Sequence, residues 1–187
     1  MGTENNIKPN HIKYSLEERR EIYARPVNLQ FLPVFVQGEA VVLKHIIKSS
    51  IAEDYPRVFD VAKALSIYFQ SPVYILPEIN ACEQDFRNLL GLSNENGCTP
   101  DIMLSNGVFV DVKSPQKMDK LARNAGKASR QSAIACITDH RLHLEIKNLD
   151  LYAQRVFGND AYIFDTVYFF IQNHLYKKTK ERHPWSL

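Results

Sequence analysis

With 187 residues, 45% of them hydrophobic, the chain is long enough for one domain with a substantial core. The formal net charge of +2 is too small to identify a nucleic-acid-binding protein, so the distribution of charge along the chain has to decide that question. Its cysteines, Cys82, Cys98 and Cys136, are odd in number and widely spaced, which argues against a disulfide framework and against a zinc knuckle.

No segment of the sequence has the composition of a membrane-targeting element. Residues 1–10 are polar and lack the apolar centre of a secretory signal peptide, and no run of about 18 apolar residues occurs. We therefore expect a soluble, cytoplasmic protein without membrane association.

Residues 1–35 are expected to form an arm ahead of the main domain, because most of them are polar or charged. Within the arm, Ser15 and Glu18 are spaced as a capping box, which predicts a short helix over 17–23. The apolar segment 29–36 contains a proline and is typical of an edge strand or an ordered linker.

Two helices and a strand are predicted in the next part of the chain. Apolar residues at helical spacing predict one helix over 39–49 and a second over 56–70, where a Ser-Pro pair ends the pattern. Residues 73–76 form a short apolar strand, and 81–97 are expected to hold a helical turn and a loop rich in Asn and Gly.

The segment 100–115 carries the strongest functional signal. Two short apolar runs flank Ser-Asn-Gly, whose Asn and Gly tolerate the positive φ of a tight turn, so the segment predicts a β-hairpin. Because side chains alternate along a strand, Asp111 and Lys113 share one face while the neighbouring valines point into the core. Asp101 opens the partner strand and is expected roughly opposite them, which gives a cluster of two acids and one amine.

In the helix predicted over 117–132, basic and apolar side chains occupy opposite faces. At 100° per residue its basic side chains form a stripe opposite an apolar stripe, so one face packs and the other is strongly positive. A polyanion backbone would be attracted to that face. The candidate nucleic-acid-binding residues are Lys117, Lys120, Arg123, Lys127 and Arg130.

The remaining elements complete an α+β fold in which helices flank a small mixed or antiparallel sheet. A strand is predicted over 133–138, a helix over 144–156 and a final aromatic strand over 166–171. The domain is expected to cover 36–176 and to be followed by a basic tail, 177–187.

A resemblance to a known family rests on several short motifs taken in order. They are Val58-Phe-Asp-Val-Ala-Lys-Ala-Leu, Val73-Tyr-Ile-Leu-Pro-Glu78, Pro100-Asp-Ile-Met-Leu, Val110-Asp-Val-Lys-Ser and Lys127-Ala-Ser-Arg-Gln. Over residues 55–175 the chain resembles the toxin nuclease domains of contact-dependent growth inhibition proteins and related phage domains in the barnase, EndoU, colicin and RelE-like group. This resemblance implies a ribonuclease, often acting on tRNA, that needs no metal cofactor and has an immunity protein as a partner.

The same region is also similar to the PD-(D/E)xK nuclease superfamily. Here the signature is Pro100-Asp101, a nine-residue gap and Asp111-Val-Lys113. That resemblance implies the element order helix, strand, hairpin, helix, strand and a DNA endonuclease in which the two acids bind magnesium. It also implies that a third acid can complete the metal site, with Glu39 or Glu78 as the candidate.

The two resemblances predict different chemistry from the same side chains. In the magnesium version the carboxylates hold a hard cation that polarises the phosphate, and Lys113 orients the water or stabilises negative charge. In the metal-free version Lys113, with Arg123 or Arg130, stabilises the added charge and a separate acid or base moves the proton. No histidine is close to the hairpin in sequence, which leaves that acid or base unassigned.

The candidate catalytic residues also have ordinary structural interpretations. An Asp-x-Lys pair on a strand is commonly a surface ion pair, a basic helix face is commonly solvated, and Ser114 can simply cap the turn before a proline. The catalytic candidates are Asp101, Asp111, Lys113 and Ser114, and the metal candidates are Asp101, Asp111 and Glu78. Three hypotheses follow: a toxin-type ribonuclease first, a magnesium-dependent endonuclease second, and a non-catalytic nucleic-acid-binding or interaction module third.

Overall fold

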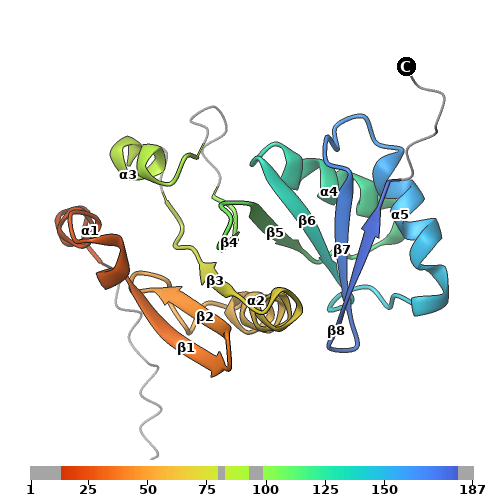
Figure 1. The fold of residues 1–187 in the computed structure, drawn as a ribbon. Helices are drawn as coiled ribbons and strands as arrows, with labels where there is room; N and C mark the ends of the chain where they lie inside the picture. Colours follow the sequence, from red (N-terminus) through yellow and green to blue (C-terminus); the bar gives the residue numbers. More distant parts are fainter. Residues whose placement is uncertain (1–13, 80–82, 93–98, 181–187) are drawn as a thin grey trace, which may run out of the picture.

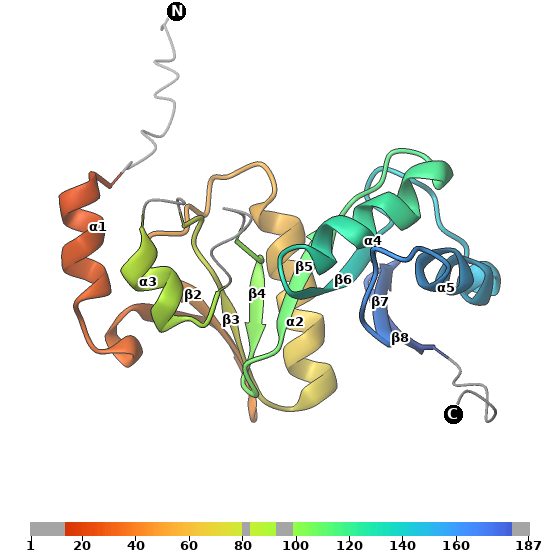
Figure 2. The same cartoon turned by 90° about the horizontal axis from the view of Figure 1, so that it is seen from above.

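A computed structural model describes residues 14–79, 83–92 and 99–180 of the chain. These residues form a mixed sheet of eight strands, arranged in chain order from β1 to β8, with helices packed against both faces (Figures 1 and 2). The expected α+β class is therefore confirmed, with a larger sheet than the sequence predicted. None of the helices in the described residues combines the length and apolar character needed to cross a bilayer.

The element bounds are as follows. The strands are β1 (Phe31–Gln37), β2 (Ala40–His45), β3 (Pro72–Ile75), β4 (Ile102–Leu104), β5 (Phe109–Lys113), β6 (Ala133–Thr138), β7 (Thr166–Ile171) and β8 (His174–Thr179). The α-helices are α1 (Leu16–Tyr23), α2 (Tyr55–Phe69), α3 (Gln84–Leu89), α4 (Leu121–Ser129) and α5 (Leu149–Phe157). Short 3-10 turns, Met118–Lys120 and Ile146–Asn148, lead into α4 and α5.

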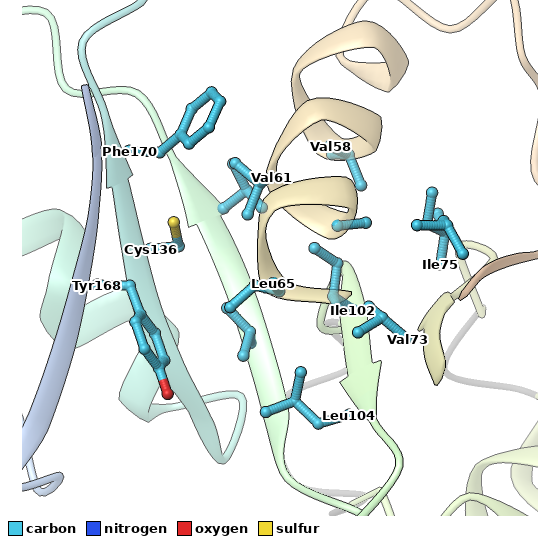
Figure 3. Close-up of a cluster of buried hydrophobic side chains, with 14 residues drawn as sticks. Val58, Val61, Leu65, Val73, Ile75, Ile102, Leu104, Cys136, Tyr168 and Phe170 are labelled. Carbon is cyan, nitrogen blue, oxygen red and sulfur yellow. The ribbon is translucent and has the colours of Figure 1, made fainter. Parts of the chain in front are cut away.

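One face of the sheet is covered by α2. Its side chains Val58, Val61 and Leu65 are fully buried against apolar residues of β3, β4, β6 and β7 (Figure 3). Both valines that flank Asp111 belong to this cluster. Their burial directs the side chain of Asp111 to the opposite face of the sheet, as the strand alternation predicted.

On the opposite face, α4 and α5 pack against β6 and β7. Leu121, Ala125 and Ala128 of α4 are fully buried with Ile137 of β6, so the apolar stripe of the predicted basic helix does face the core. Strands β5, β6 and β7 are parallel, with α4 and α5 in the connections between them. The carboxyl ends of these strands and the amino end of α4 therefore meet at one edge of the sheet.

The hairpin that carries the candidate residues forms as predicted. Gly107 takes a positive φ of 80° in the turn, and Leu104 N donates to Val108 O at 2.8 Å. β4 and β5 pair antiparallel with Ile102 opposite Val110. One residue further along this register, Asp101 lies opposite Asp111, at the edge where the parallel strands end.

The predicted helix over 39–49 is wrong, because this segment contains the strand β2. Gly38 adopts a φ of 60° and starts a hairpin between β1 and β2, and Ala40 and Val42 are buried at the period of two that belongs to a strand. β1 is an edge strand, which is the environment that its proline favours.

The predicted arm and tail both contribute strands to the sheet. β1 begins before residue 35, and β8 covers the start of the expected tail 177–187. In the arm, the capping box of α1 is present: Glu18 N donates to Ser15 Oγ at 3.2 Å and Ser15 N donates to Glu18 Oε2 at 2.6 Å. Within the predicted segment 81–97, the described residues 83–92 contain the short helix α3, as the expected helical turn predicted. The first residues of the arm, the end of the tail, Cys82, Cys98 and the rest of that segment lie outside the described residues, whereas Cys136 is buried.

Candidate active site

Asp101, Asp111 and Lys113 lie together at the edge of the sheet where β5 ends and β4 begins. The hairpin register places the two acids opposite one another, and strand alternation places Lys113 on the same face as Asp111. An ion pair joins Lys113 Nζ to Asp111 Oδ2. The structure thus brings together the three residues that the sequence predicted as a cluster.

Asp111 is a buried carboxylate. Its side chain is 3% exposed and that of Lys113 is 19% exposed, so the ammonium group reaches solvent while the carboxylate does not. Apart from this ion pair, Asp111 Oδ2 accepts no hydrogen bond within the described part of the structure. A buried carboxylate oxygen with one charged partner is poorly satisfied, which is a common property of functional groups and an uncommon one of structural groups.

Asp101 is partly buried and is held by the backbone of β5. Its Oδ2 accepts a hydrogen bond of 2.8 Å from the N–H of Val112, the residue between Asp111 and Lys113. This bond fixes the orientation of the Asp101 side chain relative to the end of the strand. Two carboxylates and an ammonium are therefore positioned by one hairpin.

Burial, and after it repulsion from Asp101, raise the pKa of Asp111 to about 7, although the ion pair with Lys113 acts in the opposite direction. The shift places the protonation change of Asp111 near neutral pH. A carboxyl group with such a pKa can transfer protons at neutral pH or exchange its proton for a cation.

The residues of this cluster fit a magnesium ion in their chemistry. Mg²⁺ prefers oxygen ligands and commonly uses one or two carboxylates, with water and substrate phosphate completing its coordination. Asp101 and Asp111 supply two carboxylates at the end of β5, and Lys113 is the charged partner of Asp111 Oδ2. A bound cation would relieve the repulsion from Asp101 that helps to raise the pKa of Asp111.

Within the described part of the chain, no third acid completes this cluster. Among the described residues, no group of three or more His, Cys, Asp or Glu side chains is arranged to hold a metal ion. Glu78 lies near the correct edge, after β3, but its side chain is exposed. Glu39 is exposed in the turn before β2, which lies at the opposite end of the strands from Asp101. The expectation that either acid completes a three-carboxylate site is therefore not met.

Ser114 follows Lys113 and points to the other side of the strand. Its Oγ lies 2.5 Å from Oγ1 of Thr138, which ends β6. This contact joins the ends of the two parallel strands, which is a structural role different from the turn cap that the sequence suggested. Ser114 nevertheless lines a cavity, so its hydroxyl can also meet a ligand.

That cavity, which we call the basic pocket, has a volume of about 320 Å³ and lies between the end of β5, α4 and the loop after β6. Its cationic lining residues are Lys120, Arg123, Lys127 and Arg141, and its neutral ones are Ser114, Gln116 and Asn124. Three of the five predicted nucleic-acid-binding residues thus share one pocket. Lys117 and Arg130, the other two, are exposed and do not line it.

Arg141 is the pocket residue that sequence reasoning missed. It lies in the loop after β6, far from α4 in sequence, and only the parallel β5 to β6 pairing brings that loop beside α4. A basic residue soon after the predicted strand 133–138 was the available signal, since loops at the carboxyl ends of parallel strands collect binding residues.

The histidines within the described residues do not join the carboxylate cluster. His45 is fully buried beside Gln30, and burial lowers its pKa to about 4, so it stays neutral and structural. His140 is exposed and lines a cavity of about 260 Å³ on the far side of Arg141, together with Arg57. The groups that shift the pKa of Asp111 are Asp101 and Lys113, with no histidine among them.

Comparisons of this chain with protein-family models, with curated proteins and with solved structures found no match.

Proposed function

We propose that the protein is a nuclease whose reaction centre is formed by Asp101, Asp111 and Lys113. One observation supports the proposal. Two carboxylates and a lysine lie together where β5 ends, and the next residue, Ser114, lines a pocket whose charged side chains are cations. Acids that can hold a cation, an amine that can stabilise negative charge and a basic surface for the backbone are the parts that phosphodiester hydrolysis needs.

The geometry favours the metal-assisted chemistry over the metal-free chemistry. A divalent cation bound by the two carboxylates would polarise the scissile phosphate and lower the pKa of an attacking water. The chain itself would orient Asp101 through the Val112 N–H and would supply the Lys113 ammonium to a phosphate oxygen or to that water. The order α2, β3, β4 with β5, α4, β6 agrees with the order that the PD-(D/E)xK resemblance implies, which supports this reading.

A metal-free ribonuclease is the second candidate, and the pKa of Asp111 favours it. A carboxyl group that titrates near pH 7 can accept the proton of a 2′-hydroxyl at neutral pH. Lys113, already paired with Asp111, would then stabilise the charge on the phosphorane. RNA, with tRNA as one form, is the substrate that the toxin-domain resemblance implies, and an immunity protein is the partner it implies.

The first test is cleavage of total RNA and of plasmid DNA, each with magnesium and with excess chelator. Cleavage that requires magnesium supports the metal-assisted mechanism, and RNA cleavage that survives the chelator supports the metal-free one. The Asp111→Asn variant is the matched control for contaminating nucleases, because it should be inactive under every condition. Absence of cleavage of both substrates contradicts the proposal and favours a non-catalytic binding module.

A further inference from the structure

We propose that the basic pocket binds the phosphate next to the scissile one, so that the enzyme prefers a substrate extending at least one phosphate beyond the bond it cleaves. This inference rests on the proposed nuclease function and adds a specific subsite to it. It also assigns a substrate-binding role to Arg141.

The charge of the pocket identifies an anion as its ligand. All four charged side chains that line it are cations, in a chain whose formal net charge is only +2. Arg123 and Lys127 have no ion pair within the described residues, and both are exposed. Unpaired cations that converge on one cavity attract a doubly or singly charged oxyanion more strongly than scattered surface charges do.

The other two cations are held only weakly by acids. Lys120 Nζ lies 3.4 Å from Asp119 Oδ2, and Arg141 Nη2 lies 3.6 Å from Glu53 Oε1. Both pairs are exposed and the distances are long, so each contributes little stability. Either cation can therefore turn from its acid to a phosphate at small cost, and the bidentate geometry of an arginine suits phosphate oxygens well.

The remaining lining residues indicate recognition of the phosphate and not of a base. Ser114, Gln116 and Asn124 are polar, and the described residues contribute no aromatic or apolar side chain to the lining of the pocket. Base recognition on single strands commonly uses stacking on aromatic rings, which this pocket does not offer. The pocket is thus suited to a contact that positions the strand independently of sequence.

The position of the pocket relates it to the reaction centre. Ser114 lines the pocket and is the chain neighbour of Lys113, so the two features adjoin along β5. A strand whose scissile phosphate meets Lys113 therefore brings its next phosphate to the pocket.

The test uses a dinucleotide with a single internal phosphodiester, made both as DNA and as RNA and assayed with magnesium, and the same dinucleotides carrying one additional phosphate at the 5′ or at the 3′ end. Binding is measured by calorimetry to the full-length Asp111→Asn protein, and cleavage is measured with the active protein. We expect one of the two terminal phosphates to strengthen binding and to raise kcat/KM by about tenfold or more, which corresponds to one charge-assisted phosphate contact.

The variant that tests the pocket is Arg123→Gln with Arg141→Gln, and its matched control is Arg155→Gln with Lys177→Gln, which removes two exposed cations elsewhere. The gain from the terminal phosphate should fall to about twofold or less in the pocket variant and stay unchanged in the control. An equal gain in both variants, or no gain from a phosphate at either end, overturns the inference.

The two proposals fail in different ways. If no RNA or DNA is cleaved but the terminal phosphate still strengthens binding through Arg123 and Arg141, the result contradicts the nuclease proposal and supports a phosphate site in the pocket. If cleavage depends on Asp111 but the terminal phosphate has no effect, the result supports the nuclease proposal and contradicts the phosphate-binding role of the basic pocket.

Discussion

Asp101 Oδ2 accepts a 2.8 Å hydrogen bond from the backbone N–H of Val112, which lies between Asp111 and Lys113. The backbone pairing of β4 with β5 covers only Ile102 with Val110 and Met103 with Phe109. The Asp101 side chain therefore continues the contact between the two strands beyond the point where their backbone pairing stops. In doing so it holds its carboxylate facing that of Asp111.

Two substitutions of Asp101 should distinguish the contribution of its hydrogen bond to stability from the contribution of its charge to cleavage. Asp101→Ala removes the bond to Val112 N–H and should lower the free energy of unfolding by about 1–3 kcal/mol, whereas Asp101→Asn keeps an acceptor oxygen and should cost less. Both variants should lose cleavage, because each leaves one carboxylate in the cluster. Urea unfolding measures the first effect, and equal destabilisation by Ala and Asn would show that the bond contributes nothing.

Asp111 should make the stability of the protein decrease as the pH rises. Its pKa is raised in the folded state, so between the ordinary carboxyl pKa near 4 and about 7 the folded protein binds more protons than the unfolded one. The free energy of unfolding contributed by this group therefore falls as the pH rises through that window. Asp111→Asn should be more stable than the unsubstituted protein at pH 8, by an amount on the order of a few kcal/mol.

Thermal unfolding between pH 4 and pH 9 measures this effect. Asp119→Asn is the matched control, because the Asp119 side chain is 65% exposed and its replacement should leave the pH dependence unchanged. A pH profile of Asp111→Asn that parallels the profile of the unsubstituted protein would contradict the burial of a high-pKa carboxyl group at this position.

Magnesium should stabilise the protein above pH 7 if the two carboxylates bind it. A ligand at about 100 times its Kd stabilises the folded state by about 2.7 kcal/mol, and relief of the repulsion between Asp101 and Asp111 makes binding stronger as Asp111 ionises. The rise in Tm should be absent in Asp111→Asn. A rise of equal size in both proteins would place the bound ion elsewhere.

The hairpin and the two packed helices were predictable from local pattern. Ser-Asn-Gly between two apolar runs is sufficient for the turn at Gly107, and the stripes of α2 and α4 follow from the helical period. The cluster of Asp101, Asp111 and Lys113 followed in turn, since both strands and their register come from one contiguous segment.

The elements that were missed depend on contacts between distant parts of the chain. The apolar residues of β2 also satisfy a helical spacing, and the pairing with β1 and β3 selects the strand. β8 is a lysine-containing edge strand, a composition that protects an edge from aggregation and that resembles a basic tail in sequence. Arg141 enters the basic pocket only because β6 lies parallel to β5.

The arm should be a stabilising part of the fold. Arg19 forms a bidentate pair with Glu83, at 2.6 and 2.8 Å, and also donates to Glu78 O at 2.6 Å. The side chains of Arg19 and Glu83 are only 12% and 9% exposed, so Arg19→Ala leaves a largely buried acid without this partner. We expect a loss of about 2–4 kcal/mol in the free energy of unfolding.

Urea unfolding of Arg19→Ala measures this loss, and Arg20→Ala is the control. Arg20 is exposed on the same helix, so its replacement removes the same charge without removing the contacts of Arg19. Because the pair lies outside the candidate active site, cleavage by the folded Arg19→Ala protein should be unchanged. Equal stabilities of the two variants would show that α1 docks by other contacts, such as the stacking of Tyr23 on Phe86.

Lys113 provides the strictest test of the reaction centre. Lys113→Met keeps the length of the side chain and removes its charge, so the pKa of Asp111 should rise further and the neutral carboxyl group should be tolerated in its buried position. Cleavage should fall by a factor of about 100 or more, which is typical for loss of one group that stabilises charge in a transition state. Lys147→Met, which removes an exposed lysine before α5, should change cleavage less than threefold and serves as the control. A folded Lys113→Met protein that still cleaves at the unsubstituted rate would show that the acids and the lysine form an ordinary ion-pair cluster, and the reaction centre would have to lie elsewhere.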